Sequence, residues 1–358
     1  MRRKRRYRRK KFRIKPIKIE KTYTFVIAIL VILCLLNIVK QDKVSNKDQE
    51  LKQVYNNQTN ENGVIGKNEV STGISLIGLE DILYEDDTKQ IPITEVNIDS
   101  VKNYDITKFK DLDYLKNTFY ILDKRTQLTA EDFNAEEFLS KDMSINTKGD
   151  KPKVLIFHTH SCEAFSDSEP GNMEQGFVKI GEMLADTLES KYGIVTMHHT
   201  GRYDYVNGGE KRLGAYERME PNIQKILDEN PSIEVVIDLH RDGVPETTRL
   251  VKMVDGKATA QIMFFNGLCR YIVNGQLAKT EQNPYLADNL ALSFQMQLKS
   301  KELYPGFTRK IYLHAFKFSL GMRPRSLLIE LGAQTNTFQE AKNSVEPLAK
   351  ILSEVLLK

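Results

Sequence analysis

Short runs of apolar residues alternate with longer amphipathic stretches from about residue 150 to the end of the chain. Apolar runs of four to eight residues are typical of strands buried on both faces of a sheet. Stretches with apolar residues every three or four positions are typical of helices packed on such a sheet. Strands are expected at 154–157, 194–197, 233–240, 309–316 and 326–331, and helices at 177–193, 210–230, 284–303 and from 337 to the C-terminus.

Local signals refine these elements and indicate the fold class. Asp255-Gly256 predicts the turn of a hairpin over 250–265. Pro221 is expected to interrupt or kink the helix at 210–230. Thr337 and Glu340 are spaced as a capping box that starts the closing helix. Because strands alternate with helices, we predict an α/β fold with a mainly parallel or mixed sheet flanked by helices on both faces.

The net charge of +4 hides a strong asymmetry along the chain. Residues 1–21 contain thirteen Lys or Arg and one Glu, which contribute +12 and leave −8 for the rest. Residues 22–39 carry no charge over eighteen positions, which approaches the length of a transmembrane helix, and no small-residue cleavage pattern follows. We expect an uncleaved single-pass anchor in the cell membrane, with a cytoplasmic basic tail and the remaining chain on the extracytoplasmic side. The acidic remainder speaks against the alternative, a nucleic-acid-binding arm.

The chain between this anchor and the regular α/β pattern is expected to contain two segments. Residues 40–75 are rich in Asn, Gln, Lys and Ser and poor in aromatic residues, which predicts a flexible tether. Residues 76–145 are expected to form an N-terminal extension of mixed short elements, with helices at 79–87 and 129–142. The spacing of Thr129 and Asp132 is a start signal for the second of these helices. The catalytic domain is expected at 146–358.

Groups able to bind a metal ion follow or end three of the predicted strands. His158, His160 and Glu163 follow the first strand, His240 ends the third, and Glu330 lies near the end of the last. In α/β sheets, ligands bind at the carboxyl ends of the strands, so these side chains are expected to share one site. The three cysteines include no CxxC pair, which excludes a cysteine-rich zinc site and a disulfide framework.

These residue types supply the inventory of a catalytic zinc site. Such sites often have two His and one Glu as ligands and keep one position open for water, and His160, Glu163 and His240 provide that set. Glu330 is the candidate general base, because amide hydrolysis needs a group that takes a proton from water and returns it to the leaving amine. A carboxylate within an apolar strand is costly to bury unless it is paired or functional, which supports this role.

Structural alternatives remain for several histidines. His240 also suits a core histidine that is satisfied by Asp238 or Asp242. An HxH pattern on a strand directs both imidazoles to one face, so His158 is an alternative to His160 as first ligand, or a residue that orients it. The histidines expected to be solvated or structural are His198, His199 and His314.

The motifs "HSCE", "IDLH" and "IEL", in this order, resemble the HxxE…H…E layout of zinc carboxypeptidases. Residues 118–358 more closely resemble the stage II sporulation protein P family of spore-forming bacteria. A basic N-terminus followed by one membrane anchor fits that family too. The resemblance rests on the segments "FYILDKRTQLTAEDFN", "VLIFHTHSCEAF", "GAYERM", "VVIDLHRDG", "AQIMFFNG", "ELYPGFTRKIYL" and "LLIELGAQTNTFQEAK".

This resemblance implies a zinc-dependent N-acetylmuramoyl-L-alanine amidase with an amidase/carboxypeptidase-like α/β fold. The implied substrate is peptidoglycan, whose amide between N-acetylmuramic acid and L-alanine is hydrolysed, with cleavage of peptide cross-links also attributed to the family. The implied process is thinning of the cell wall during forespore engulfment, in a complex with stage II sporulation protein D and stage II sporulation protein M.

One departure from more distant amidases leaves the glutamate ligand open. Those enzymes place it over ten residues after the first histidine, and Glu174 lies fourteen residues after His160. The "HTHxxE" pattern of the resembled family favours Glu163. Arg241 is a candidate oxyanion contact, and Arg323, with its neighbour Arg325, is a candidate contact for stem-peptide carboxylates.

Three other interpretations use parts of the same inventory. A zinc carboxypeptidase or peptidoglycan endopeptidase would share the metal ligands. An amidohydrolase barrel would need further strand-borne histidines, and the chain has only six histidines. A tethered wall-binding scaffold with an inactive site is a different class of protein, and the intact Glu330 beside a full ligand set speaks against it.

Overall fold

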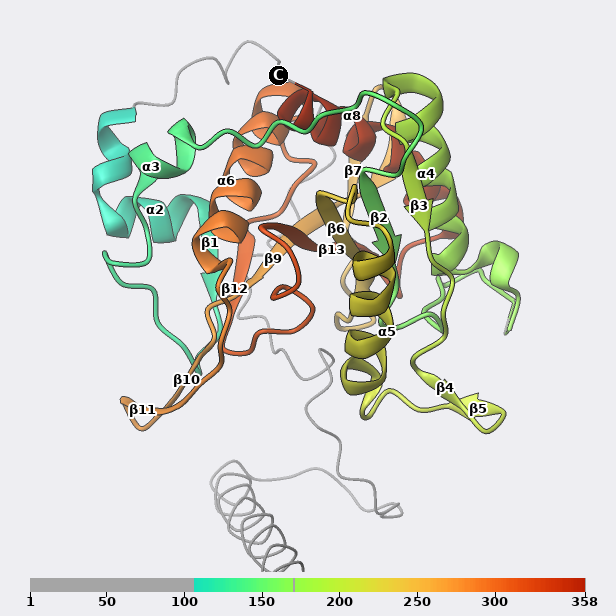
Figure 1. Cartoon of the computed structure of the whole chain (residues 1–358), viewed down its shortest axis with the longest axis horizontal. Helices are drawn as coiled ribbons and strands as arrows, with labels where there is room; N and C mark the ends of the chain where they lie inside the picture. Colours follow the sequence, from blue (N-terminus) through green and yellow to red (C-terminus); the bar gives the residue numbers. More distant parts are fainter. Residues whose placement is uncertain (1–105, 170, 358) are drawn as a thin grey trace, which may run out of the picture. The chain divides into compact units, whose positions relative to one another are not determined.

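The computed structural model describes residues 106–169 and 171–357, and a seven-stranded sheet lies at the centre of this part (Figure 1). Across the sheet the strands follow the order β1, β12, β9, β13, β6, β2, β3. Their bounds are β1 Tyr120–Leu122, β2 Val154–Phe157, β3 Thr196–His198, β6 Val235–Asp242, β9 Ile262–Gly267, β12 Ile311–His314 and β13 Arg325–Ala333.

The sheet is mixed, and its strand directions define two different edges. Strands β13, β6, β2 and β3 run parallel to one another. Strand β9 runs antiparallel to β13, and β12 and β1 follow the direction of β9. The carboxyl ends of β2, β6 and β13 therefore meet at one edge, whereas β1 and β12 end at the opposite edge. An open mixed sheet excludes the barrel considered above.

Helices cover both faces of the sheet, as the sequence predicts. On one face, α4, α6 and α8 share a core with alternate strand residues such as Ile156 and Ile237. On the other face, α5 packs Met219 and Ile223 against Leu155 and its neighbours. The helices are η3 Ile106–Lys110, α2 Leu112–Phe119, α3 Ala135–Ser140, η4 Met173–Gln175, α4 Phe177–Tyr192, α5 Ala215–Glu229, α6 Leu286–Leu303, α7 Phe338–Asn343 and α8 Val345–Leu356.

Three turn and cap signals are confirmed. Gly193 ends α4 in the left-handed conformation at φ 65°, and Thr337 and Glu340 form the capping box of α7. Asp255 and Gly256 have φ 49° and 74°, as a two-residue type I′ hairpin turn requires. This turn joins β7 Val251–Val254 to β8 Lys257–Ala260. Four other short strands lie outside the central sheet: β4 Tyr205–Val206, β5 Gly209–Glu210, β10 Arg270–Val273 and β11 Gln276–Thr280.

Several boundaries differ from the expectation. The hairpin ends at Ala260, and the following residues join the central sheet as β9. Helix α5 begins only at Ala215 and continues through Pro221, whose ring lies on the exposed side, where water can bind the carbonyl left without an amide donor. The closing helix is divided at Ser344, whose hydroxyl donates to the carbonyl of Ala260 at 2.7 Å.

The segment expected as an N-terminal extension contributes to the central sheet and core. Strand β1 pairs in parallel with β12, and Phe119 and Phe133 pack edge-on against Phe294 of α6. The expected helix start at Thr129 is wrong, because Asp132 closes a turn there by accepting from the Thr129 amide and hydroxyl. Helix α3 starts instead after Asn134, whose side chain caps it.

The basic tail at 1–21, the expected anchor at 22–39, the tether at 40–75 and the helix at 79–87 lie outside the described residues. Of the helices described between residues 106 and 357, none combines the length and apolar character that a membrane crossing requires.

Candidate metal centre

The loop after β2 is held against β6 by a buried carboxylate. Asp238 of β6 accepts hydrogen bonds from the Thr159 amide at 3.0 Å and from the Thr159 hydroxyl at 2.8 Å. One step further, Asp204 accepts from the Ser161 hydroxyl and the Cys162 amide. These bonds turn the chain after Phe157 and bring the side chains of His160 and Glu163 towards β6.

This turn brings His160, Glu163 and His240 together. One nitrogen or oxygen from each lies within 4.8 Å of the other two, and all three residues are buried. The Glu163 Oε1 atom lies 3.6 Å from His160 Nδ1 and 3.8 Å from His240 Nδ1. These separations exceed hydrogen-bond length but are close to the ~3.3 Å expected between ligand atoms arranged tetrahedrally at ~2 Å around zinc. The donor set and the spacing therefore fit a zinc ion.

His240 is oriented for ligation by the carboxylate behind it. Its Nε2 atom lies 2.8 Å from Asp238 Oδ1, while its Nδ1 atom faces Glu163. The contact with Asp238 is short but poorly aligned, so neither ring nitrogen has a well-formed hydrogen bond among the described residues. Burial lowers the pKa of His240, but the charge of Asp238 and contacts with Glu163 outweigh it and raise that pKa well above its usual value. A carboxylate behind a ligand histidine is a common feature of metal sites.

Glu163 is held in its ionised form. Its Oε2 atom accepts from the backbone amide of Arg241 at 2.9 Å, and its Oε1 atom accepts from Arg212 Nη2 at 3.1 Å. Burial alone would raise its pKa, but contacts with His160 and His240 and the charge of Arg212 hold it well below its usual value. The Arg212 nitrogen also lies 3.0 Å from His160 Nδ1, so this arginine borders two of the three candidate ligands.

Glu330 lies beside this group of candidate ligands. It stands directly opposite His240 in the parallel register of β13 and β6. Its side chain is 1% exposed, and neither carboxylate oxygen has a hydrogen-bond partner among the described residues. Burial, and then the negative charge of Asp242, raise the pKa of Glu330 to about 8. A carboxyl group with such a pKa can both take up and release a proton near neutral pH.

His158 lies apart from the ligand group. Its Nδ1 lies 2.9 Å from the Leu239 carbonyl and its Nε2 lies 3.0 Å from His198 Nε2. The ring fills the space beside Gly181 of α4, where a Cβ atom would approach it to 2.4 Å. The strand ends at Phe157, so the alternation that would place both imidazoles on one face no longer applies. Burial lowers the pKa of His158 to about 3. The structure thus favours His160 as the ligand.

Two further sequence candidates are not brought to this group. The Glu174 side chain is 76% exposed and pairs with Lys179 at 3.2 Å. Arg323 precedes β13 at the opposite edge of the sheet, where its guanidinium donates to the carbonyls of Met322 and Leu227. Its neighbour Arg325 donates to the carbonyl of Ser144.

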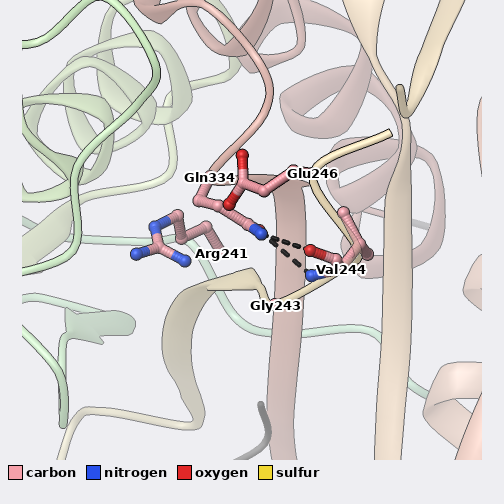
Figure 2. A pocket seen from close by; sticks show the side chains of 5 residues that line it. All are labelled: Arg241, Gly243, Val244, Glu246 and Gln334. Carbon is pink, nitrogen blue, oxygen red and sulfur yellow. Dashed lines mark hydrogen bonds between the residues drawn. The ribbon is translucent and has the colours of Figure 1, made fainter. Parts of the chain in front are cut away.

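A pocket of about 290 Å³ lies where β6 and β13 end (Figure 2). It is lined by Arg241, Gly243, Val244, Glu246 and Gln334. Figure 2 shows the Gln334 amide bonded to the backbone of Val244, which closes the pocket wall. Because the Arg241 backbone binds Glu163, this pocket adjoins the candidate ligands. Of the arginines predicted to contact the substrate, Arg241 lines this pocket and Arg323 does not.

Sequence reasoning missed the roles of Arg212 and Tyr216. Arg212 lies in the loop before α5, and the Tyr216 ring contacts the rings of His160 and His240. The segment "GAYERM", which contributes to the family resemblance, contains Tyr216 and was the available signal. Asp238 was anticipated only as a partner for His240, and the contact is confirmed.

The family model that describes Stage II sporulation protein P matches residues 37–353 of the chain. Stage II sporulation protein P of Bacillus subtilis (strain 168) is 24% identical over 231 residues, which are 60% of this chain and 54% of that protein. The chain therefore aligns with about half the length of this relative.

Two solved structures are similar over most of their own length. The N-acetylmuramyl-L-alanine amidase from Mycobacterium smegmatis has a TM-score of 0.37 and 12% identity, covering 60% of this chain and 95% of that one. The N-acetylmuramoyl-L-alanine amidase from Clostridium difficile 630 has a TM-score of 0.34 and 14% identity, covering 58% of this chain and 96% of that one.

Proposed function

The chain belongs to the stage II sporulation protein P family, and from this premise we propose that it is a zinc-dependent N-acetylmuramoyl-L-alanine amidase of the cell wall. The observation that carries the proposal is the buried carboxylate of Glu330 opposite His240, next to the three candidate ligands and without a hydrogen-bond partner in the described part of the chain. Such a carboxylate costs stability, and a proton acceptor at the site of amide hydrolysis accounts for that cost.

His160, Glu163 and His240 would hold the zinc ion. When bound, zinc would supply a polarised scissile carbonyl and a water that reacts near neutral pH. Asp238 orients the His240 ring, and the Arg241 amide and Arg212 hold the Glu163 carboxylate in place.

The proton movements follow from the position of Glu330. It takes a proton from the attacking water as the new C–O bond forms at the muramoyl carbonyl carbon. It returns that proton to the alanine nitrogen as the C–N bond breaks. The products are a carboxylate on the muramoyl side and a free amino group on L-alanine. Arg241, at the pocket edge, contacts the substrate at the oxyanion or at a nearby stem-peptide group.

The cellular setting is part of the same proposal. Residues 22–39 anchor the chain in the membrane with residues 1–21 in the cytoplasm, which places the hydrolase at the extracytoplasmic side of the engulfing septum. Stage II sporulation proteins D and M are the proposed partners. The support is the charge asymmetry of the N-terminus and the family membership.

Product analysis tests the enzymatic proposal. The full-length protein is incubated with purified peptidoglycan, with a chelator, and with chelator followed by zinc, and the products are identified by mass spectrometry. We expect stem peptides with free L-alanine amino termini, lost with chelator and restored by zinc. Cleaved cross-links without such termini would identify an endopeptidase instead, and retention of sacculi without cleavage would identify a wall-binding scaffold.

A further inference from the structure

Tyr216 lies in the first turn of α5 and covers one side of the candidate metal centre. Its ring is edge-on to His160, with centroids 5.7 Å apart, and nearly parallel to His240 at 6.5 Å. Phe318 packs against the same ring at 5.4 Å. The ring is therefore fixed between the two candidate imidazole ligands and an aromatic neighbour, which limits where its hydroxyl can point.

The hydroxyl of Tyr216 is buried and has no hydrogen-bond partner among the described residues. Leaving a hydroxyl buried and unpaired lowers the stability of the folded protein. The nearby Tyr203 hydroxyl, by contrast, pairs with His199 at 2.7 Å. Because the ring lies against His160 and His240, the hydroxyl of Tyr216 belongs to the lining of the candidate metal centre.

The Tyr216 hydroxyl is one of the hydrogen-bond donors beside the candidate ligands, and two of the others are engaged with those ligands. Arg212 donates to His160 and Glu163, and the Arg241 amide donates to Glu163. Amide hydrolysis places negative charge on the carbonyl oxygen, next to the carboxylate of Glu163, while Glu330 holds the proton taken from water. An oriented donor is needed there to offset the repulsion. A phenol ordinarily titrates near pH 10, so it keeps its proton and donates near neutral pH.

We propose that the Tyr216 hydroxyl donates a hydrogen bond to the scissile carbonyl oxygen of the substrate as that oxygen gains negative charge. Tyr216 is then a catalytic residue of the amide hydrolysis, and this inference rests on the function proposed above. The hydroxyl keeps its proton throughout, because the proton that moves is carried by Glu330. The donor acts on the transition state, so it affects kcat rather than ground-state binding.

Tyr216→Phe tests the inference, since it keeps the ring contacts with His160 and His240 and removes only the hydroxyl. For the full-length, zinc-loaded protein we expect kcat to fall by about 10²–10³-fold, as for removal of one oxyanion donor. KM and zinc affinity should each stay within about threefold, because neither depends on a bond made only in the transition state.

The matched control is Tyr120→Phe. The Tyr120 hydroxyl is also buried without a partner, but its ring packs in the core against Phe133 and Phe294. Its removal should leave kcat, KM and zinc affinity unchanged. Equal losses of kcat in both variants would overturn the inference, because they would reflect a general effect of deleting a buried hydroxyl.

A second readout needs no turnover. A phosphinate analogue of muramoyl-L-alanine, in which a tetrahedral phosphorus replaces the scissile carbonyl, should bind Tyr216→Phe at least tenfold more weakly than the wild type by calorimetry. The product stem peptide should bind both equally. Equal phosphinate affinities, or an unchanged kcat, would overturn the role of Tyr216 and leave the amidase proposal standing.

Other outcomes are also decisive. A drop in zinc affinity in Tyr216→Phe would make the residue a support of the metal site, and a rise in KM alone would make it a ground-state contact. Both overturn the inference. Failure of the wild type to release L-alanine termini refutes the proposed function instead, and phosphinate binding by the two proteins still decides whether Tyr216 is a donor.

Discussion

Two buried clusters of histidine and carboxylate lie at opposite edges of the sheet, and their hydrogen bonding differs. In the edge cluster, Arg125 donates to both oxygens of Asp123 at 2.9 and 2.6 Å. His314 lies 3.0 Å from Asp123 through Nε2 and accepts from the Phe316 amide through Nδ1. In the candidate metal centre, both oxygens of Glu330 lack partners among the described residues.

The contrast shows that residue types alone do not mark a reactive site. The edge cluster joins the ends of β1 and β12, and pairing offsets the cost of burying its charges. The candidate metal centre has polar atoms without a hydrogen-bond partner among the described residues, which lowers stability and keeps those atoms available to an ion, a water or a substrate. Unpaired buried atoms, rather than a gathering of His, Asp and Glu, therefore distinguish the two regions.

The largest expected effect comes from Glu330→Gln. Activity on peptidoglycan should fall by about 10²–10⁴-fold, because the amide cannot accept a proton from water. The melting temperature should be equal to or higher than that of the wild type, since a buried carboxylate without partners is replaced by a neutral group of the same shape. Product release and thermal unfolding are measured in parallel. Residual activity within tenfold of the wild type would remove Glu330 from the mechanism.

A smaller effect is expected from Asp238→Asn, which removes the negative charge beside Nε2 of His240. Zinc affinity should fall by about 10–100-fold, as for other residues that support metal ligands. Competition with a chromophoric chelator measures this directly. Glu174→Gln is the matched control, because its exposed side chain pairs with Lys179 at the surface and its loss should leave zinc affinity unchanged. The reverse pattern would restore Glu174 as the ligand.

In the edge cluster, Asp123→Asn should act on stability and not on catalysis. We expect the free energy of unfolding in urea to fall by about 1–3 kcal/mol, because Arg125 and His314 lose a buried, hydrogen-bonded charge. Both kcat and zinc affinity should match the wild type. A variant of full stability with reduced kcat would show that the two clusters are functionally coupled.

The last prediction concerns the dependence of stability on pH. Burial lowers the pKa of His314 to about 4, whereas an exposed histidine in the unfolded chain titrates near 6.5. Between these values the unfolded chain binds the proton and the folded chain does not. The free energy of unfolding should therefore decrease as pH falls from about 6.5 towards 4. Above pH ~6.5 the stability is not reduced by this group, because His314 is neutral in both the folded and the unfolded chain. His314→Gln should make this decline shallower in urea titrations at several pH values, and an identical decline would assign it to other groups.

The sequence by itself determined most of the elements and the main ligand candidates. Apolar runs such as 154–157 can only be buried, so the strand at β2 was found to the residue. Turn and cap positions were also recoverable, because Gly193 and Asp255-Gly256 satisfy local backbone requirements. His160, Glu163 and His240 were recoverable because parallel strands deliver the residues at their carboxyl ends to one edge.

Only the tertiary structure decided which neighbouring side chains take part. The reversal of β9, the pairing of β1 with β12, and the entry of Tyr216 from α5 depend on contacts between residues far apart in the chain. The separation of His158 from His160 depends on where the strand ends and on the space beside Gly181. Local patterns report which backbone a segment prefers. The direction of a side chain beyond a strand end, and whether a buried atom finds a partner, are set by the packing of the whole fold.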